Sequence, residues 1–328
     1  MFRSKMKTLV TFALALGATA LPAVCMAQPF TRMEYRAVES MTLTGEQFLV
    51  GDKNGKPVSL AGELRIPTPG TNRLPAVILV HGSGGISASA DRWAQELNSI
   101  GVAAFILDTF SGRGIVSTVN DQSQLHSLAM MVDAYRALAM LASHSRIDPN
   151  RIAIMGFSKG AVASVYSSNE RFRTLYGPGN VQFAAHIGLY TPCNVRYSGD
   201  EKTTAKPVRL FHGIADDYVS IEPCRVYAAR LKSAGTDVLL TEYPGAYHAY
   251  DAFMLKQPVK FPQGQTTRNC WLEEGKDGAI LNAKTGKSFD LNDACVEKGP
   301  QVAYNQPAHE ATVKAVKEML ADIFGLAK

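Results

Sequence analysis

The stretch from Ile152 to Gly160 constrains the fold more than any other part of the chain. Its first four residues form an apolar run typical of a buried strand, and small residues resume at helical spacing after Gly160. Between them lies Gly156-Phe157-Ser158-Lys159-Gly160, a G-x-S-x-G sequence in a strand-turn-helix setting. Glycines suit such a turn because larger neighbours would collide with the strand and the helix. The stretch predicts Ser158 as a nucleophile at the carboxyl edge of a sheet, with a chance Gly/Ser turn as the alternative.

The rest of the chain alternates strand and helix patterns around this stretch. Further strands are expected at residues 76–80, 102–107, 183–190, 208–212 and 238–243, and helices at about 88–100, 121–143, 222–234 and 306–324. Alternation of this kind implies a mostly parallel sheet with helices on both faces, which is an α/β fold. Before it, alternating polar and apolar positions predict an antiparallel hairpin with strands at 42–50 and 58–66. Residues 28–328 are long enough to form one large domain.

Residues 256–302 break this rhythm. They carry few strong periodicities and many Gly, Asn, Asp and Lys residues. We therefore expect an inserted hairpin or lid just before the last helix. A small excursion with little core of its own needs a covalent staple, which is worth roughly 2–4 kcal/mol.

The first 27 residues have the features of a cleaved secretory signal. Three cations precede an apolar run over residues 9–24, and Ala27 ends a short run that a signal peptidase could read. A membrane anchor is the alternative, but the run is short and is interrupted by Gly17 and Pro22. We expect a secreted or periplasmic protein without stable membrane insertion. The formal charge is +5 with three of the cations in this signal, so the remainder is too weakly basic to favour nucleic acid as a partner.

Four cysteines remain after the signal, and an even number in an exported protein suggests two disulfides. We expect Cys193 to pair with Cys224, because both follow apolar strands that should be neighbours at one edge of the sheet. Cys270 and Cys295 would then close a local loop within residues 256–302. Four free buried thiols are the alternative.

A serine nucleophile needs a base to take its proton and a carboxylate to orient that base. An acid pair, Asp216-Asp217, follows the strand at 208–212, and His248 follows the strand at 238–243. Ser158, Asp216 and His248 are thus all expected at carboxyl ends of strands, in the chain order nucleophile, acid and base. We expect Asp216 to be the acid and Asp217 to be a solvated neighbour, although either could instead cap the helix that follows.

Other histidines fit the pattern less well. We expect His309 to lie on the surface of the last helix, and His212 to be hydrogen-bonded at the end of its strand. His248 alone follows the acid on a loop at a strand end. His248 is therefore the predicted base.

The loop His81-Gly82-Ser83-Gly84-Gly85 follows the strand at 76–80 and can supply backbone amides. An oxyanion needs two donors, and we assign the amides of Ser83 and Lys159. A phosphate cradle is the alternative for this loop, but it lacks a Gly-Lys-Ser/Thr ending. No histidine or cysteine cluster has zinc spacing, so we expect neither a metal nor another cofactor.

These motifs resemble the α/β-hydrolase superfamily in its dienelactone-hydrolase-like branch, over roughly residues 55–255 and the last helix. The resemblance rests on the loop at 81–85, Asp108-Thr-Phe-Ser-Gly-Arg-Gly114, the pentapeptide at 156–160, the acid loop at 213–219 and His248-Ala-Tyr. Dienelactone hydrolase uses a cysteine nucleophile, whereas this chain has Ser158. The resemblance therefore implies generic serine esterase chemistry rather than dienelactone opening. Asp108 and Arg113 either shape the pocket or form a structural ion pair.

The function predicted is hydrolysis of carboxylic esters, small or oligomeric, through an acyl-enzyme. Two alternatives remain. A peptidase or amidase could use the same three residues, and a binding protein could retain them without turnover. Covalent labelling by a fluorophosphonate would separate the last of these, since a pocket without catalysis should not react.

Overall fold

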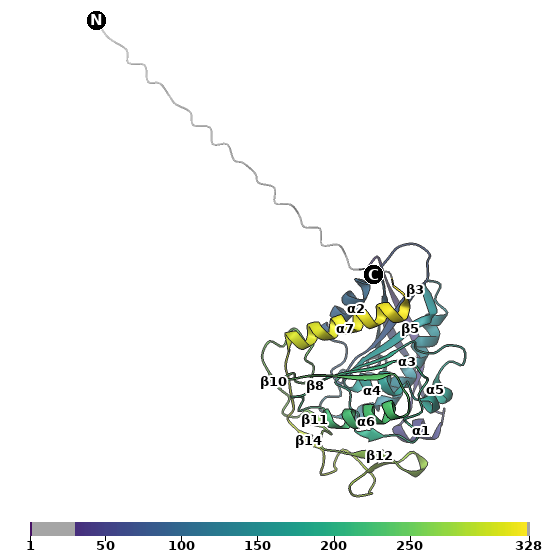
Figure 1. Ribbon diagram of the computed structural model, residues 1–328, viewed down its shortest axis with the longest axis vertical. Helices are drawn as coiled ribbons and strands as arrows, with labels where there is room; N and C mark the ends of the chain where they lie inside the picture. Colours follow the sequence, from purple (N-terminus) through teal and green to yellow (C-terminus); the bar gives the residue numbers. More distant parts are fainter. Residues whose placement is uncertain (2–29, 327–328) are drawn as a thin grey trace.

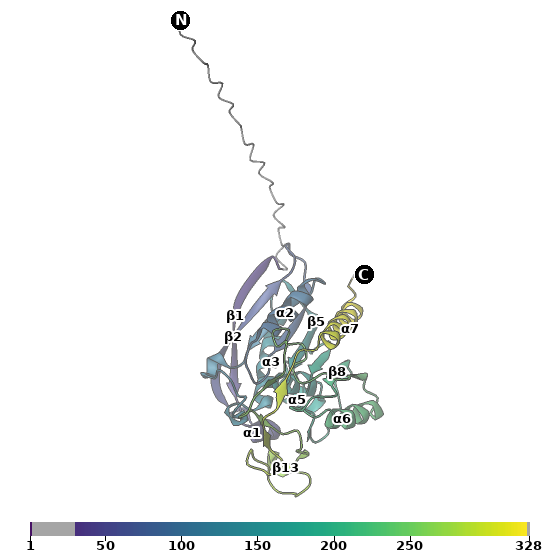
Figure 2. The ribbon, with the colours of Figure 1, turned by 90° about the vertical axis from the view of Figure 1, so that its left-hand side faces the viewer.

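The computed structural model describes Met1 and residues 30–326, and the predicted signal and its cleavage site at Ala27 lie outside this range. An eight-stranded sheet has the order β1-β2-β4-β3-β5-β6-β8-β9. β1 and β2 form an antiparallel edge that is visible in Figure 2, and β2 also runs antiparallel to β4. The remaining neighbours are parallel, from β4 across to β9. The chain is thus the mostly parallel α/β fold that its alternating pattern predicts.

The strands of this sheet are β1 Arg32–Thr42, β2 Lys56–Ile66, β3 Leu74–Val80, β4 Ala103–Asp108, β5 Ile147–Phe157, β6 His186–Leu189, β8 Val208–Gly213 and β9 Val238–Tyr243. The helices are α1 Gly45–Val50, α2 Ala88–Asn98, α3 Ser127–Ala142, α4 Lys159–Tyr166, α5 Glu170–Tyr176, α6 Glu222–Ser233 and α7 Gln306–Phe324. No helix within residues 30–326 combines the length and apolar character that crossing a bilayer requires.

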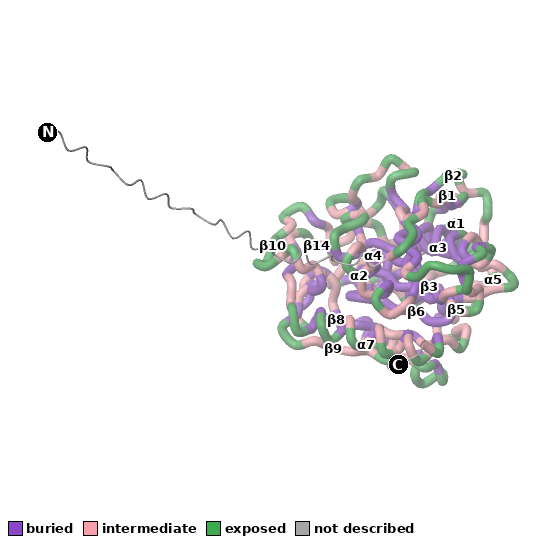
Figure 3. Tube along the Cα trace, turned by 90° about the horizontal axis from the view of Figure 1, so that it is seen from above, coloured by how far each residue is buried: buried purple, intermediate pink, exposed green. Residues whose placement is uncertain are grey.

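Two apolar layers hold the sheet between its helices. One layer packs α2 and α7 against one face through Trp93, Leu97 and Leu320. The other packs α3, α4 and α6 against the opposite face, with Tyr135 and Tyr166 among its large side chains. Figure 1 shows this division, and Figure 3 shows the buried interior running along the sheet. Residues of a strand point alternately to the two faces of the sheet, and helices cover both faces. β3 is therefore apolar at nearly every position.

The prediction of a first strand at 42–50 was wrong. The strand is β1, Arg32–Thr42, and residues 45–50 form helix α1. Thr44 caps this helix, because its side chain accepts from the Gln47 amide while the Gln47 side chain accepts from the Thr44 amide. This capping box stabilises a short helix locally and overrides the alternating pattern. The helix expected at 121–143 is also shorter, since α3 begins at Ser127 after a 3₁₀ turn at Gln122–Gln124.

Both predicted disulfides are present. Cys193 pairs with Cys224 and Cys270 pairs with Cys295. Two disulfides fit an extracellular protein.

Residues 256–302, called the stapled segment from here on, contain short strands and one 3₁₀ turn at Lys276–Gly278. The strands are β10 Val259–Lys260, β11 Gln265–Thr266, β12 Leu272–Glu274, β13 Ile280–Asn282, β14 Glu297–Lys298 and β15 Gln301–Val302. β12 also pairs with β7, Val195–Arg196, outside the segment. Figure 1 shows β12, and Figure 2 shows β13, at the lower end of the molecule, away from the N-terminal end of the described chain.

Candidate active site

Ser158 occupies a tight turn between β5 and α4. Its backbone has φ 52° and ψ −117°, a conformation that a residue with a side chain rarely adopts. The flanking glycines make this possible: a Cβ at Gly156 would lie 2.2 Å from the Gly160 carbonyl oxygen, and one at Gly160 would lie 2.2 Å from the Val80 carbonyl oxygen. The turn therefore requires glycine at both positions, and it places Ser158 at the carboxyl edge of the sheet.

A chain of hydrogen bonds joins the three predicted side chains. His248 Nδ1 lies 2.8 Å from Asp216 Oδ2, and His248 Nε2 lies 3.0 Å from Ser158 Oγ. Because a carboxylate can only accept, Nδ1 carries the proton and Nε2 accepts from the serine hydroxyl. Residues 90 apart in sequence are thus brought within bonding distance at the ends of β5, β8 and β9, which lie in the same parallel part of the sheet, with β6 between β5 and β8.

The carboxylate of Asp216 is buried and fully engaged. Its Oδ1 accepts from the amides of Tyr218 at 2.9 Å and Val219 at 2.8 Å, while Oδ2 faces His248. Burial by itself would raise the pKa of Asp216, but His248 and His212 outweigh burial and hold this pKa below its usual range. Asp216 is therefore ionised and able to stabilise an imidazolium on His248.

Two tyrosine rings pack against the His248 ring. The ring centroids of Tyr190 and Tyr218 lie 4.6 Å and 4.7 Å from that of His248. The Tyr190 hydroxyl donates to Asp251 at 2.8 Å, and the indole of Trp93 donates to the other oxygen of the same carboxylate at 2.8 Å. Asp251 thus anchors the His248 loop to helix α2. The sequence patterns did not single out Tyr190 or Asp251, because their contacts join distant parts of the chain.

The loop at 81–85 passes directly against the serine. A Cβ at Gly82 would lie 3.3 Å from Ser158 Cβ, so the backbone of this loop and the turn are in contact. His81 fixes the loop, since its Nδ1 lies 2.8 Å from the Gly82 carbonyl oxygen and its Nε2 accepts from the Thr109 amide at 3.2 Å. The Lys159 amide is the first of helix α4, where the helix itself provides no acceptor. Both amides assigned to the oxyanion therefore belong to backbone beside Ser158.

The side chain of Lys159 crosses to the loop at residues 117–122. Its Nζ donates to Thr118 Oγ1, to the Gln122 carbonyl oxygen and to Gln122 Oε1 at 3.3, 3.0 and 3.1 Å. Gln122 Oε1 also accepts from Ser83 Oγ at 3.1 Å, so one amide oxygen links the two residues assigned to the oxyanion. Burial lowers the pKa of Lys159 to about 7, opposed by the charge of Asp121. The G-x-S-x-G pattern accepts any residue after the serine, so it did not indicate that Lys159 would be buried beside the nucleophile.

Three sequence expectations need correction. Asp217 is not simply solvated, because its Oδ1 accepts from the Gln301 amide at 3.0 Å. Arg113 forms an ion pair at 2.7 Å, but with the buried Asp133 of α3, whereas Asp108 accepts from amides of the following turn. His309 is buried rather than exposed, with its ring 6.1 Å from that of Trp93. For Asp217, Arg113 and His309, a partner far along the chain decides the environment.

His212 lies at the end of β8 as expected, with Nε2 3.0 Å from the Val219 carbonyl oxygen. Within residues 30–326, no cluster of three or more His, Cys, Asp or Glu side chains is placed to hold a metal ion.

The sheet order and the helices on both faces define an α/β-hydrolase fold, with Ser158 on its strand-to-helix turn. The model of the dienelactone hydrolase family matches residues 62–261, which is more than half of the chain, and the chain belongs to this family. Membership supports hydrolase activity. The family match ends near the start of the stapled segment.

Solved structures agree with this fold. A dienelactone hydrolase-like promiscuous phosphotriesterase from metagenomic libraries is 15% identical with a TM-score of 0.55, covering 89% of this chain and 98% of that chain. Esterase 2 of Thermogutta terrifontis, phosphoramylated by tabun, is 16% identical with a TM-score of 0.56, covering 90% of this chain and 96% of that chain. Its paraoxon-phosphorylated form is 16% identical with a TM-score of 0.55 over the same shares of the two chains. Among curated proteins, none matches this sequence.

Proposed function

We propose that this protein is a serine hydrolase that cleaves carboxylic esters, small or oligomeric, through an acyl-enzyme. The observation that carries the proposal is the continuous chain Asp216–His248–Ser158, with distances of 2.8 Å and 3.0 Å, ending on a serine in strained backbone. The ionised Asp216 and the Nδ1–H tautomer of His248 support His248 as the base.

In the first half of the reaction, Ser158 Oγ attacks the ester carbonyl while His248 Nε2 takes the hydroxyl proton. The amides of Ser83 and Lys159 donate to the oxyanion of the tetrahedral intermediate. The C–O bond to the alcohol then breaks, and the alcohol leaves with the proton from His248. In the second half, water attacks the acyl-Ser158 while His248 takes its proton. His248 then returns this proton to Ser158 Oγ as the bond to the acyl group breaks and the acid is released.

The experiment compares wild type with Ser158→Ala on p-nitrophenyl esters from acetate to octanoate. Removing a nucleophile of this kind lowers kcat by about a millionfold, so the variant should retain at most background hydrolysis. Thermal melting and circular dichroism establish that the variant is folded. The chain-length optimum of the wild type measures the acyl pocket. Wild-type turnover that persists in folded Ser158→Ala would overturn the assignment.

A covalent probe tests the nucleophile separately from turnover. The structural neighbour esterase 2 is described as phosphorylated by paraoxon, which makes paraoxon a suitable probe here. Mass spectrometry should find one diethyl phosphoryl group on the peptide containing Ser158. Labelling without ester turnover would favour an amidase or peptidase, and absence of both would favour a binding protein.

The site of action is proposed to be outside the cytoplasm. The two disulfides and the signal-like first 27 residues support this. Edman sequencing of the exported protein should begin at Gln28, whereas retention of residues 1–27 in a membrane fraction would contradict it.

A further inference from the structure

The stapled segment bonds to backbone just after the proposed catalytic acid. Thr266 Oγ1 donates to the Tyr218 carbonyl oxygen at 2.5 Å, and Arg268 Nη1 donates to the Asp217 carbonyl oxygen. The residues involved are more than forty positions apart in sequence. The acid loop therefore has a second set of partners beyond His248.

These two carbonyls belong to the peptide groups whose amides hold Asp216. The Asp217 carbonyl and the Tyr218 N–H are opposite ends of one planar peptide, as are the Tyr218 carbonyl and the Val219 N–H. Both amides donate to Asp216 Oδ1, at 2.9 Å and 2.8 Å. A donor fixed on the carbonyl side prevents each peptide from rotating and strengthens the hydrogen bond on its other side. Thr266 and Arg268 thus each act on Asp216 through one planar peptide group.

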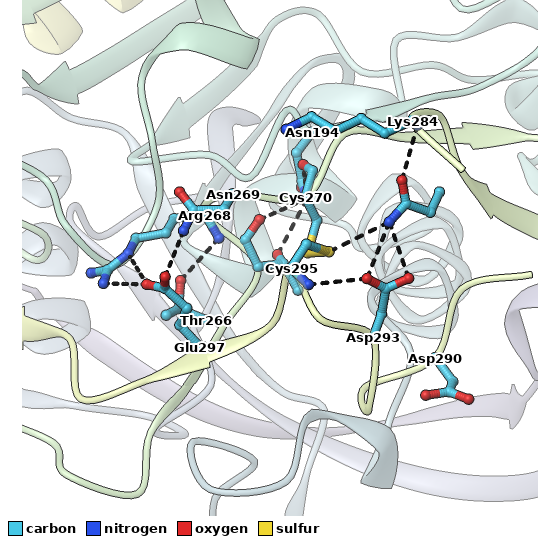
Figure 4. The surroundings of a disulfide bond; sticks show 12 residues. Asn194, Thr266, Arg268, Asn269, Cys270, Lys284, Asp290, Asp293, Cys295 and Glu297 are labelled. Atoms are coloured by element: carbon cyan, nitrogen blue, oxygen red, sulfur yellow. Dashed lines mark hydrogen bonds and ion pairs between the residues drawn. A yellow bond between two sulfur atoms is a disulfide. The ribbon is translucent and has the colours of Figure 1, made fainter. Parts of the chain in front are cut away.

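Arg268 is itself held in one orientation. Its Nε donates to Glu297 Oε2 at 2.8 Å and its Nη2 bonds the same oxygen, which leaves Nη1 directed at Asp217. Asn269 Nδ2 donates to the second oxygen of Glu297 at 2.8 Å. Figure 4 shows Arg268 and Asn269 converging on Glu297 beside the disulfide. The guanidinium is a planar fork, so two bonds to one side determine where the third points.

Arg268 and Glu297 are called the clamp from here on. The disulfide and a strand pair hold these two residues together. Cys270 lies two residues after Arg268, and Cys295 lies two residues before Glu297. β11 and β14 pair antiparallel, with Thr266 opposite Glu297. Asp293 Oδ1 accepts from the Cys295 amide at 3.0 Å, as Figure 4 shows. It also accepts from Asn282 Nδ2 at 3.1 Å, which extends the anchorage. The clamp is therefore secured from both sides.

The segment also contacts the other two loops of the site. Val302 forms a β-bridge with His248, and the Ala303 amide just beyond the segment donates to the His248 carbonyl oxygen at 3.3 Å. Gln265 Oε1 accepts from the Gln122 amide at 2.9 Å, next to the Lys159 network. One stapled element thus contacts the acid loop, the histidine loop and the loop at 117–122.

We propose that Arg268, clamped by Glu297 and the Cys270–Cys295 disulfide, is a positioning residue for Asp216, with Thr266 as its second support. This inference rests on the proposed function. Arg268 bonds to Glu297 and to the Asp217 carbonyl oxygen rather than to Ser158, and it acts on Asp216 through the Asp217–Tyr218 peptide. Its loss should slow the chemical step without changing ester binding.

The test measures kcat and KM of Arg268→Gln on the p-nitrophenyl ester that wild type hydrolyses fastest. Loosening of catalytic geometry from a distance lowers kcat by about tenfold or more, and KM should stay within about twofold. Arg268→Lys should recover part of the loss, because it keeps one charged donor without the fork. Mass spectrometry of the intact protein confirms that both disulfides are formed.

The matched control is Arg171→Gln. Arg171 makes a bidentate ion pair with Glu274 of the same segment, at 2.8 Å and 2.7 Å, and its side chain has nearly the same exposure as that of Arg268, 32% against 28%. It pairs with β12 rather than with the acid loop. Its kcat should stay within about twofold of wild type. Equal losses in the two variants would reduce Arg268 to an ordinary structural ion pair and overturn the inference.

Two further readouts keep the inference testable if Arg268→Gln fails to fold. Thr266→Val removes one hydroxyl with little change in volume, and it should lower kcat in the same direction. Proton NMR of each folded variant reports the His248 Nδ1 proton bonded to Asp216 as a strongly downfield signal. This signal should weaken or move in Arg268→Gln and Thr266→Val but not in Arg171→Gln.

The outcomes of the two proposals are distinguishable. Wild type that neither hydrolyses esters nor reacts with paraoxon would overturn the proposed function, whatever the NMR spectra show. Variants with the kcat and the downfield signal of wild type would overturn the role of Arg268 and leave the proposed function standing.

Discussion

The central sheet and the stapled segment are stabilised by different interactions. Within β3 and β5, residues such as Ile78 and Ile154 are fully buried between two layers of helices. The stapled segment has strands of two or three residues. A disulfide and an ion pair cross-link it internally, and a further ion pair and polar side chains join it to the rest of the chain. Apolar burial contributes about 25 cal/mol per Å², so a region with little of it must be cross-linked. The sheet can therefore place strand ends, while the segment adjusts the loops that follow them.

The largest expected effect separates two adjacent carboxylates. Asp216→Asn keeps the size of the side chain but removes the charge that fixes the His248 tautomer, and it should lower kcat about 10⁴-fold. Asp217→Asn keeps an oxygen for the Gln301 amide and loses an ion pair with Arg268 at 3.9 Å, so its loss should stay below about tenfold. Steady-state kinetics of both variants measure this. Equal losses of kcat in Asp216→Asn and Asp217→Asn would show that the segment and the sheet edge contribute equally to catalysis.

A core truncation should destabilise the whole protein. Ile154→Ala removes a fully buried side chain of β5 and should lower the free energy of unfolding by about 2–5 kcal/mol. Ile280→Ala in β13 removes a side chain that is only partly buried and should cost about half of that or less. Urea titration followed by circular dichroism gives both values. A larger effect at Ile280 would contradict the contrast between the two regions.

Removal of the segment's staple should act locally. Cys270→Ser with Cys295→Ser opens a bridge across a sequence separation of 25, and it should destabilise the segment by about 3 kcal/mol. Hydrogen exchange should accelerate at β11 to β14 and stay unchanged in β5, and kcat should fall as the Arg268 clamp loosens. Equal acceleration in β5 would mean that segment and sheet unfold as one unit.

The buried Lys159 at the edge of the sheet should make the free energy of unfolding depend on pH. Burial lowers its pKa to about 7 in the folded protein, against 10.5 as the ordinary value. Between these values the unfolded chain binds a proton that the folded chain does not, so stability rises with pH across this window. Relative to Lys159→Met, wild type should gain on the order of 1 kcal/mol of unfolding free energy per pH unit from pH 7 to 10. Urea titrations at each pH measure the difference, and a constant difference would contradict a buried, titrating lysine.

The smallest effect is expected at the surface of the sheet edge. Arg225 of α6 pairs with Glu242 of β9, and both side chains are about one-third exposed, 37% and 30%. Arg225→Ala should change the free energy of unfolding less than any of the preceding variants, because exposed pairs are screened and entropically costly. Thermal melting at low and high salt checks this. A change as large as that of the disulfide variant would show that ion pairs stabilise the sheet edge as well as the segment.

Much of the sheet and of the proposed site could be predicted from sequence. β9 and α7 have the expected bounds, because an apolar strand and an amphipathic helix bounded by Pro307 and Gly325 are encoded by neighbouring residues. Ser158, Asp216 and His248 were identifiable because each follows a strand, and parallel strands bring their carboxyl ends to one edge. Helix α1 was missed although Thr44 and Gln47 form a capping box, so there the signal was present in the sequence.

Other features depended on the tertiary structure. The pairing of Arg113 with Asp133, the burial of His309 and the bond from Arg268 to the Asp217 carbonyl join residues from 20 to more than 200 positions apart. No periodicity records such contacts, since they depend on how layers and loops pack after the strands have formed. The sequence by itself determined which residues stand at the carboxyl edge of the sheet. Only the tertiary structure decided which distant side chains hold them there, because long-range contacts are fixed by packing and not by local pattern.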